Sequence, residues 1–381
     1  MQKHIVRKSD IRGVVGVDVD LGNFYVLTQS FLVWLKNQAP FQRVIVGMDG
    51  RLHSHDIYQK VSQAIIDAGY QVYFVGVCPT PVLVHALYHL STHVGIMITA
   101  SSAGSEYNGL KLYAQKTLVE GIALQEIYDI ATHGIVVQSA VQGKIIPCPI
   151  VDHYIDTLKQ YFSHLSKYDF SVIVDTGHGT MGPVVTRLIQ SMEWKNVQVI
   201  RSTVEPIFAT GSCDVVTAQH VYHLREALSH QKDTLGVAFD GDGDRCAFID
   251  ETNTFVSSER MAAIFAQQIV HNNPSRTVVH DLQDAMWLDT VLYRVHGKTV
   301  TMYNRSKSFT DAMLPVEVVF GVQQHGRYFF KDRHFGYPDG LYTFLRLLDI
   351  LVQRQMKLRD LVVAFPIKII GLSEQTFQQE Y

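Results

Sequence analysis

The most informative stretch of the sequence is Asp240-Gly-Asp-Gly-Asp-Arg245, in which three carboxylates alternate with glycine. Glycine leaves the backbone free to curl, so the three side chains can converge on one cation. Oxygen ligands without a nearby His or Cys favour Mg²⁺ over zinc or copper. The apolar runs 235–239 and 246–249 flank the motif and predict a strand, a loop and a second strand. The expected magnesium ligands are Asp240, Asp242 and Asp244.

Two other interpretations of this motif compete with a magnesium site. The aspartates and Glu251 fit positions 1, 3, 5 and 12 of an EF-hand calcium loop, but Arg245 stands at position 6, where that loop needs glycine. The flanking strands also disagree with the helices of an EF-hand. The other interpretation is an acidic turn that faces solvent, although such a turn has no need of alternating glycines or of a terminal arginine.

The chain as a whole has the composition of an ordinary globular protein. Its 381 residues are 47% hydrophobic and 18% charged, with a formal net charge of −3, and this length predicts two or three domains of ~100–150 residues each. A net negative charge provides no excess of positive charge that would attract nucleic acid or an anionic membrane. We therefore expect neither as a partner.

Cysteine spacing and apolar runs indicate where the protein resides. The four cysteines include no CxxC pair, so neither a zinc site nor a disulfide framework is indicated. The apolar run 24–35 is broken by Thr28, Gln29 and Ser30, so no signal peptide or membrane span is expected. A reduced, cytoplasmic setting follows.

Alternating strands and helices must position the aspartates. Strands are expected at 43–47, 71–77 and 94–98, with helical spacing around 57–65. A second unit starts near Tyr168 and a third follows Pro274, each with the same rhythm. This alternation predicts α/β domains with mostly parallel sheets covered on both faces. The expected domains are 1–150, 151–256 and 257–370, with 371–381 as a remnant or tail.

A serine-rich loop begins at Thr99, where the strand at 94–98 ends, and runs to Lys111. Loops at the carboxyl ends of parallel strands are where α/β proteins bind ligands, so this loop is a candidate site. Taken alone, a polar Ser/Gly loop is more often a plain connector. A glycine-rich turn at 176–182 is weaker evidence still, because it has neither GxGxxG nor a Walker lysine.

Short motifs in a fixed order give the sequence a specific resemblance. They are Asp10-Ile-Arg-Gly13, Gly47-Met-Asp-Gly-Arg51, Pro79-Thr-Pro81, Thr99-Ala-Ser101, Tyr107-Asn-Gly109, Lys111, the aspartate motif and Gly336 to Gly340. From about residue 8 to about residue 365 the chain resembles the α-D-phosphohexomutase family, the phosphomannomutases and phosphoglucomutases. The resemblance implies three consecutive phosphohexomutase-type α/β domains around a cleft, with the family's fourth domain absent.

The resemblance also implies a reaction. Ser101 maps onto the serine that is phosphorylated in active family members, and the phosphoserine shares Mg²⁺ with the three aspartates. Its phosphoryl group passes to a hexose phosphate, and the resulting bisphosphate returns its other phosphate to the serine. A phosphoserine carries about −1.5 to −2 charges, so a dication neutralises charge as the bond to the serine breaks. Arg12, Lys111 and Arg245 could supply further positive charge, or form structural ion pairs only.

Several family residues are replaced. The His-Asn-Pro that follows the family's serine is here 102–104, Ser-Ala-Gly. The sugar-reading loop, Gly-Glu-x-Ser-Gly-His in the family, has Gln323 for glutamate and His325 for serine. A loop that usually reads Arg-Thr-Gly-His-Ser is here 304–308, Asn-Arg-Ser-Lys-Ser, and Gln283 stands in place of a basic residue. The expected substrate-binding residues are Gln323, His325, Arg305 and Lys307.

The family's fourth domain clamps the distal phosphate and would follow about residue 370, but the sequence ends at Tyr381. Without this clamp the bisphosphate should escape more easily and water should reach the phosphoserine. One interpretation is an impaired phosphohexomutase that acts on mannose or glucose phosphates. A second is a catalytically inactive family member that serves as a binding or regulatory protein. A third is a split enzyme whose missing domain comes from a separate polypeptide.

Overall fold

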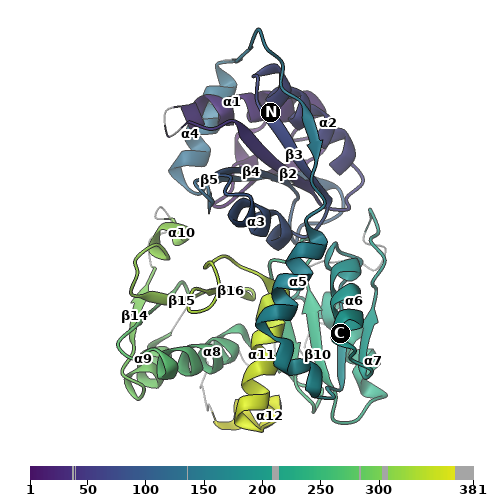
Figure 1. Ribbon diagram of the computed structural model, residues 1–381, viewed down its shortest axis with the longest axis vertical. Helices are drawn as coiled ribbons and strands as arrows, with labels where there is room; N and C mark the ends of the chain where they lie inside the picture. Colours follow the sequence, from purple (N-terminus) through teal and green to yellow (C-terminus); the bar gives the residue numbers. More distant parts are fainter. Residues whose placement is uncertain are drawn as a thin grey trace.

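Three β-sheets follow one another along the chain, and helices cover each of them (Figure 1). The structure is a computed structural model that describes residues 1–364 apart from 37, 39, 135, 208–213, 283–284 and 303–307, and only the backbone of 218 and 286. Within these ranges, none of the helices combines the length and the apolar character that crossing a membrane requires.

The first sheet has seven strands in the order β1-β5-β4-β2-β3-β7, with β6 paired to β5. Side chains alternate along β2, so that Val44 and Val46 face one core and Ile45 faces the other. The strands are β1 (Ile11–Val14), β2 (Arg43–Met48), β3 (Gln71–Val77), β4 (Val94–Ile98), β5 (Tyr107–Ala114), β6 (Thr117–Leu118) and β7 (Ile145–Pro147). The helices are α1 (Leu21–Lys36), α2 (Ser54–Asp67), α3 (Thr80–His89) and α4 (Ile122–Thr132).

The second sheet has five strands in the order β12-β11-β10-β8-β9. Its faces are covered by α5 and α6 on one side and by α7 on the other. The strands are β8 (Val172–Asp175), β9 (Val197–Ile200), β10 (Leu235–Phe239), β11 (Cys246–Ile249) and β12 (Phe255–Val256). The helices are α5 (Val151–Tyr161), α6 (Met181–Met192) and α7 (Ala218–Ser229).

The third sheet has four strands in the order β14-β13-β15-β16. The strands are β13 (Thr277–His280), β14 (Lys298–Thr301), β15 (Val318–Gln323) and β16 (Arg327–Phe330). The helices are α8 (Ser258–Asn272), α9 (Met286–Tyr293), α10 (Phe309–Ala312), α11 (Gly340–Arg354) and α12 (Leu358–Ala364). Helix α11 contacts both β11 and β16, so it joins the second sheet to the third (Figure 1).

The three sheets share one four-strand pattern, β3-β2-β4-β5, β9-β8-β10-β11 and β14-β13-β15-β16. In each, the first three strands are parallel and the fourth returns antiparallel to the third. The expectation of mostly parallel sheets therefore holds for these three strands of each sheet, and the fourth strand departs from it. An antiparallel return needs only a short loop, whereas a parallel one needs a long crossover. We name these loops the serine loop (99–106), the aspartate loop (240–245) and the glutamine loop (323–326).

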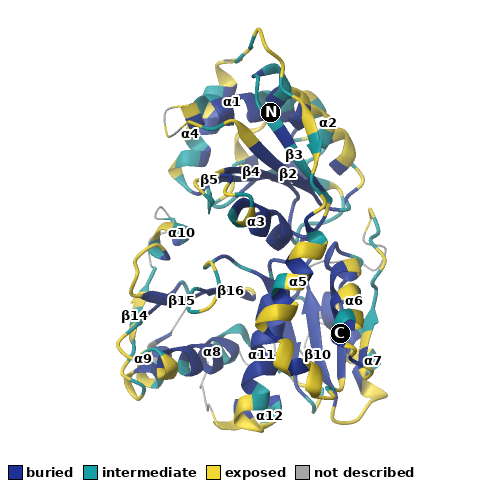
Figure 2. Ribbon diagram, viewed as in Figure 1, coloured by how far each residue is buried: buried dark blue, intermediate teal, exposed yellow. Residues whose placement is uncertain are grey.

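The hydrophobic core crosses the boundaries between the sheets. One continuous cluster includes Leu83 of α3, Val237 of β10 and Phe320 of β15, and Figure 2 shows the buried strands and inner helix faces in dark blue. A separate cluster, with Phe31 and Ile96, fills the opposite face of the first sheet. The shared cluster fixes how the loops of the three sheets lie relative to one another, because close-packed interiors resist displacement.

The first and third sheets are also linked by a polar contact at the start of α10. The Glu120 carboxylate accepts hydrogen bonds from Ser308 Oγ at 2.8 Å, from the Thr310 backbone N–H at 3.2 Å and from Thr310 Oγ1 at 3.1 Å. A carboxylate at a helix N-terminus satisfies N–H groups that have no partner inside the helix. This contact closes a ring that runs from the first sheet through the second to the third.

Candidate functional site

The aspartate loop joins two antiparallel strands, β10 and β11, which confirms the predicted strand, loop and strand. Asp240 and Asp242 are fully buried and Asp244 is 3% exposed. One carboxylate oxygen from each lies within 4.8 Å of the others. Gly243 has a positive φ of 72°, and a Cβ there would meet Met181 Cε at 2.5 Å, so this turn depends on glycine.

Both alternative interpretations of this loop are wrong. Strands flank it where an EF-hand needs helices, and Glu251 instead accepts hydrogen bonds from the backbone N–H groups of Leu358 and Arg359 at α12. A turn that faces solvent is excluded because the three carboxylates are buried.

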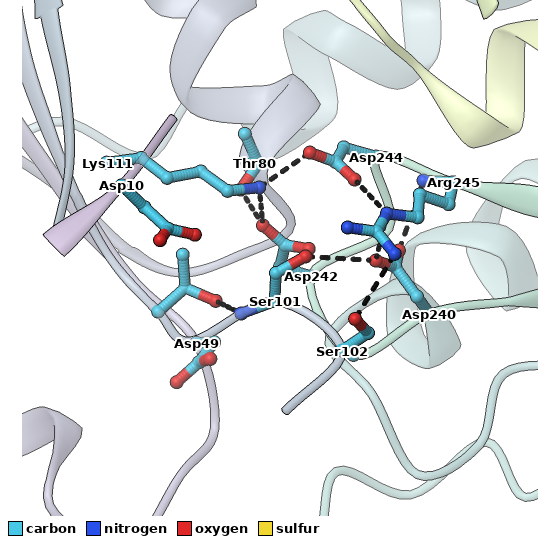
Figure 3. A network of polar contacts seen from close by, with 12 residues as sticks. Asp10, Asp49, Thr80, Ser101, Ser102, Lys111, Asp240, Asp242, Asp244 and Arg245 are labelled. Atoms are coloured by element: carbon cyan, nitrogen blue, oxygen red, sulfur yellow. Dashed lines mark hydrogen bonds and ion pairs between the residues drawn. The ribbon is translucent and has the colours of Figure 1, made fainter. Parts of the chain in front are cut away.

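Ser101 lies against the aspartate loop, as Figure 3 shows. Its Oγ donates to Asp240 Oδ2 at 3.3 Å, and its backbone N–H donates to Thr99 Oγ1 at 2.9 Å. Ser101 is fully buried and has a left-handed φ of 53°. A non-glycine residue holds this conformation only where its surroundings impose it, so the serine loop is firmly fixed.

Arg51 is the residue that fixes the serine loop. Its buried guanidinium donates to four backbone carbonyls at 2.5 to 3.1 Å, while its Nε donates to Asp49 Oδ2 at 3.0 Å. The four carbonyls belong to Ser101, Ala103, Gly104 and Tyr107. Arg51 belongs to one of the motifs that carry the resemblance, but its type alone did not mark it as a support for the loop.

Basic side chains from all three sheets surround the aspartates. Lys111 of β5 places Nζ 2.5 Å from Asp242 Oδ2 and 2.5 Å from Asp244 Oδ2. Arg327 of β16 donates to both oxygens of Asp244, from NH2 at 3.0 Å and from Nε at 3.3 Å. Arg245 places Nε 3.7 Å from Asp244 Oδ1. The buried carboxylates are thus paired with charges of opposite sign, as burial requires.

The surroundings of Asp240 and Asp244 shift the pKa values of these two residues in opposite directions. Burial would raise the pKa of Asp244, but Arg327 and Lys111 outweigh it and hold that pKa far below its usual range. Burial likewise opposes the charge of Lys111, yet Asp242 and Asp244 raise the Lys111 pKa and keep it protonated. The pKa of Asp240 is raised well above its usual range by burial and by the charges of the other two aspartates.

Two of the predicted arginines contact the residues directly before and after Ser101. Arg12 of β1 donates from NH1 to the carbonyl of Ala100 at 3.0 Å, and Arg245 donates from NH1 to Ser102 Oγ at 3.2 Å. The structure therefore brings the predicted catalytic and metal-binding residues to one place. They are Arg12, Ser101, Lys111, Asp240, Asp242, Asp244 and Arg245.

The predicted substrate-binding residues lie differently. Gln323 donates from Nε2 to Asp281 Oδ2 at 3.3 Å, and His325 is exposed with a φ of 64°. Arg305 and Lys307, together with the replaced position Gln283, lie outside the described residues.

Thr80 and Arg327 contact the aspartate loop but were not predicted as site residues. Thr80, the first residue of α3, donates from Oγ1 to Asp242 Oδ2 at 2.5 Å and from its backbone N–H to the Asp242 carbonyl at 2.8 Å. Its place between two prolines in Pro79-Thr-Pro81 was the available signal. Arg327 stands where the family loop ends in His, and this replacement was its signal.

The aspartate loop fits a hard divalent cation. Asp242 Oδ1 is buried and has no hydrogen-bond partner among the described residues, and such an orphaned oxygen is costly unless something binds it. The donors are carboxylate oxygens, which suit Mg²⁺. The residues that could hold the ion are Asp240, Asp242 and Asp244.

Known proteins resemble this chain along nearly its whole length. Models of the phosphoglucomutase/phosphomannomutase family match it as α/β/α domain I at 3–135, domain II at 152–253 and domain III at 257–368. A phosphomannomutase/phosphoglucomutase of Pseudomonas syringae pv. tomato is 29% identical over 365 residues, which are 95% of this chain and 77% of the relative. A phosphoglucomutase of Neisseria gonorrhoeae is 28% identical over 92% of this chain and 75% of its own length.

Solved structures share the fold. A phosphoglucomutase/phosphomannomutase family protein of Burkholderia thailandensis superposes with a TM-score of 0.87, covering 96% of this chain and 81% of its own. The sequences of the two are 23% identical, so this likeness concerns the architecture.

Proposed function

The chain belongs to the phosphoglucomutase/phosphomannomutase family, and from this premise we propose that it interconverts hexose 1-phosphate and hexose 6-phosphate, with mannose or glucose as the sugar. The observation that carries the proposal is the contact of Ser101 Oγ with Asp240 Oδ2 at 3.3 Å, between residues 139 positions apart. A phosphoryl carrier has to lie beside the groups that bind its counter-cation, and this pairing supports such a role for Ser101.

In the proposed reaction Ser101 carries a phosphoryl group between turnovers. The bond from phosphorus to Ser101 Oγ breaks, a bond from phosphorus to the free sugar hydroxyl forms, and the hydroxyl proton ends on Ser101 Oγ. The sugar is then a bisphosphate. Its other phosphoryl group returns to Ser101 by the reverse exchange, which leaves the remaining phosphate on the other carbon of the hexose.

The residues around Ser101 would support this transfer through charge and position. Arg12 and Arg245 contact the residues on either side of the serine, where they can stabilise the charge of a moving phosphoryl group. Arg51 holds the loop carbonyls in place, which keeps the carrier oriented. Mg²⁺, when bound by the three aspartates, supplies further neutralisation of the phosphoryl oxygens.

Access to Ser101 limits the proposed activity. Its side chain is fully buried, which excludes water from a phosphoserine but also requires the covering residues to move before a hexose phosphate can react. The replacements Gln323 and His325 alter the acceptors that the family uses for sugar hydroxyls. We propose an impaired mutase for these reasons.

A catalytically inactive protein that binds hexose phosphate or regulates a partner is the second candidate function. The burial of Ser101 and the pairing of Asp244 with Arg327 favour it, because the first keeps substrate from the serine and the second gives Asp244 a partner without metal.

The deciding experiment measures turnover of mannose 1-phosphate and glucose 1-phosphate with Mg²⁺ and a hexose 1,6-bisphosphate activator. We expect activity that falls to background in Ser101→Ala and persists in Ser105→Ala, which removes a hydroxyl from the same loop. Phosphopeptide mapping should locate the phosphate on Ser101. Equal activity in Ser101→Ala would overturn the carrier role, whereas hexose phosphate binding without turnover in folded wild-type protein would establish the second candidate.

A further inference from the structure

Arg327 reaches the aspartate loop from a different sheet. It is the first residue of β16, and the preceding Gly326 has a positive φ of 77° and its carbonyl accepts a hydrogen bond from the Cys246 N–H at 3.1 Å. A Cβ at Gly326 would meet the Cys246 carbonyl oxygen at 2.4 Å. This glycine lets the two hairpins approach closely, and the approach places Arg327 against Asp244.

Arg327 forms a hydrogen bond with each of the two carboxylate oxygens of Asp244. NH2 lies 3.0 Å from Oδ2 and Nε lies 3.3 Å from Oδ1, and both residues are buried. Two parallel hydrogen bonds of this kind are the strongest arrangement between guanidinium and carboxylate. The carboxylate of Asp244 is therefore already paired with a cationic side chain of the protein itself.

The carboxylates of the loop already have basic partners without a metal. Three basic side chains lie within 4 Å of them, and they are Lys111, Arg245 and Arg327. Mg²⁺ takes oxygen ligands at about 2.0–2.1 Å, and a dication at Asp244 would face the fixed guanidinium at short range. Like charges in a buried site repel strongly, so the ion and Arg327 oppose each other at this carboxylate.

We propose, on the premise that the aspartate loop binds Mg²⁺ as in the proposed function, that Arg327 is a resident cation that competes with the metal for Asp244. Mg²⁺ binds when the guanidinium leaves this carboxylate. The affinity of the protein for divalent cations is then lower than its three aspartates alone would give. Arg327 is a positioning residue in this scheme, since it acts on the site through Asp244.

The test uses the full chain with Mn²⁺ as the probe, its free concentration followed by electron paramagnetic resonance and the Mg²⁺ affinity obtained by competition. Arg327→Gln should bind Mn²⁺ about tenfold more tightly than wild type, which corresponds to about 1.4 kcal/mol. Arg327→Lys keeps the charge but cannot pair with both oxygens, so its affinity should fall between the two, and it decides the question if the glutamine variant does not fold. Arg359→Gln removes the same charge at an exposed pair with Asp233 and should leave the affinity unchanged.

Two further measurements separate the possible outcomes. Adding Asp242→Asn to Arg327→Gln should abolish the gain, which places the probe at the aspartates. Thermal unfolding should show a larger Mn²⁺-induced rise of Tm for Arg327→Gln than for wild type, because tighter binding to the native state stabilises it more.

The outcomes distinguish this inference from the proposed function. Equal Mn²⁺ affinity in wild type and Arg327→Gln would overturn the role of Arg327 and leave the metal site standing. No Mn²⁺ binding in either protein would overturn both the metal site and the competition. Tighter binding in Arg327→Gln, together with no sugar-phosphate turnover in wild type, would support the competition and count against the mutase.

Discussion

The aspartate loop and the glutamine loop occupy equivalent places in their sheets but differ in how they are held. Each connects the third strand of the shared pattern to the antiparallel fourth. The aspartate loop is buried and bonded to residues of the other two sheets. In the glutamine loop His325 is exposed, and Gln323 bonds to Asp281, which follows β13 of the same sheet. This loop is linked to the second sheet through a backbone bond from Cys246 to the Gly326 carbonyl and not through a charged side chain of the loop. The shared strand order thus places a loop at the site. Burial and charged partners determine whether that loop is held in one conformation.

The largest difference between the two loops should appear when an acidic partner is removed. Asp244→Ala leaves Lys111 and Arg327 buried without their shared carboxylate, which should cost about 3–5 kcal/mol of unfolding free energy. Asp281→Ala, the matched change beside the glutamine loop, should cost about 1 kcal/mol, since it removes hydrogen bonds from partly exposed groups. Urea unfolding without metal measures both, and similar losses would contradict the comparison.

The serine loop extends the comparison to a third hairpin. Arg51→Met removes the donor for four carbonyls and leaves Asp49 without its buried partner, and we expect a loss of about 3 kcal/mol. Arg12→Met removes one carbonyl bond and the contact with Asp10 at 3.4 Å, both made by a partly exposed side chain, so a smaller loss of about 1–2 kcal/mol is expected. Chemical unfolding of the two variants is the measurement. If Arg12→Met cost as much as Arg51→Met, the loop would not depend on Arg51.

A pH titration compares a buried histidine with the exposed one in the glutamine loop. Burial, with His153 and His89 nearby, lowers the pKa of His85 on α3 from 6.5 to about 4. The unfolded state therefore takes up the proton first, so this contribution to stability is present above pH 6.5 and is lost as the pH falls toward 4. The loss is at most about 3 kcal/mol.

His85→Gln should flatten the dependence of unfolding free energy on pH between 6.5 and 4. His325→Gln is the matched control, since His325 is exposed. An unchanged slope in His85→Gln would assign the acid sensitivity to other groups.

The smallest effect is expected within the glutamine loop. Gln323→Glu restores the residue type of the family but replaces a hydrogen bond to Asp281 Oδ2 with two facing carboxylates. We expect a loss of about 1 kcal/mol at pH 7, which salt should reduce. His325→Ser should change stability by less than about 0.5 kcal/mol. Thermal unfolding at two salt concentrations tests both, and a stabilising Gln323→Glu would show that Asp281 does not set the environment of this loop.

Local patterns in the sequence predicted the parts of the fold that depend on neighbouring residues. The alternation of Asp and Gly in 240–245, between two apolar runs, was enough to predict a cation-binding loop between strands. The strands at 71–77 and 94–98 have the expected bounds. Such segments are encoded by periodicity and by residues that end them.

Contacts between sheets could not be predicted in this way. Arg327 meets Asp244 across 83 residues and Thr80 meets Asp242 across 162, and such pairs depend on how whole sheets pack. Strands β5 and β16 were missed altogether, and the predicted serine-rich loop ends before Tyr107, where β5 begins, and not at Lys111. The antiparallel direction of β11 was not predicted either, because an apolar run alone does not determine the direction of its strand.

Helix α1 was missed for a local reason. Polar residues interrupt its apolar run, but Thr28 Oγ1 donates to the Phe24 carbonyl at 2.7 Å and Ser30 Oγ to the Val26 carbonyl at 2.8 Å. Gln29 Nε2 donates to the Ala64 carbonyl of α2 at 2.7 Å. Because each of these polar side chains donates a hydrogen bond to a backbone carbonyl, it can be buried in the helix packing.

The contact between Glu120 and the start of α10 has a mechanical consequence. Three bodies joined only in series would swing about two hinges, each independently of the other. The hydrogen bonds from Ser308 and Thr310 to Glu120 help to close the three bodies into a ring, together with the contact of Lys8 with Asp281 and the stacking of Tyr88 on Phe335. Any motion that separates the first and third bodies must first break these bonds. The rate at which the bonds break therefore sets an upper limit on how often the two bodies can separate.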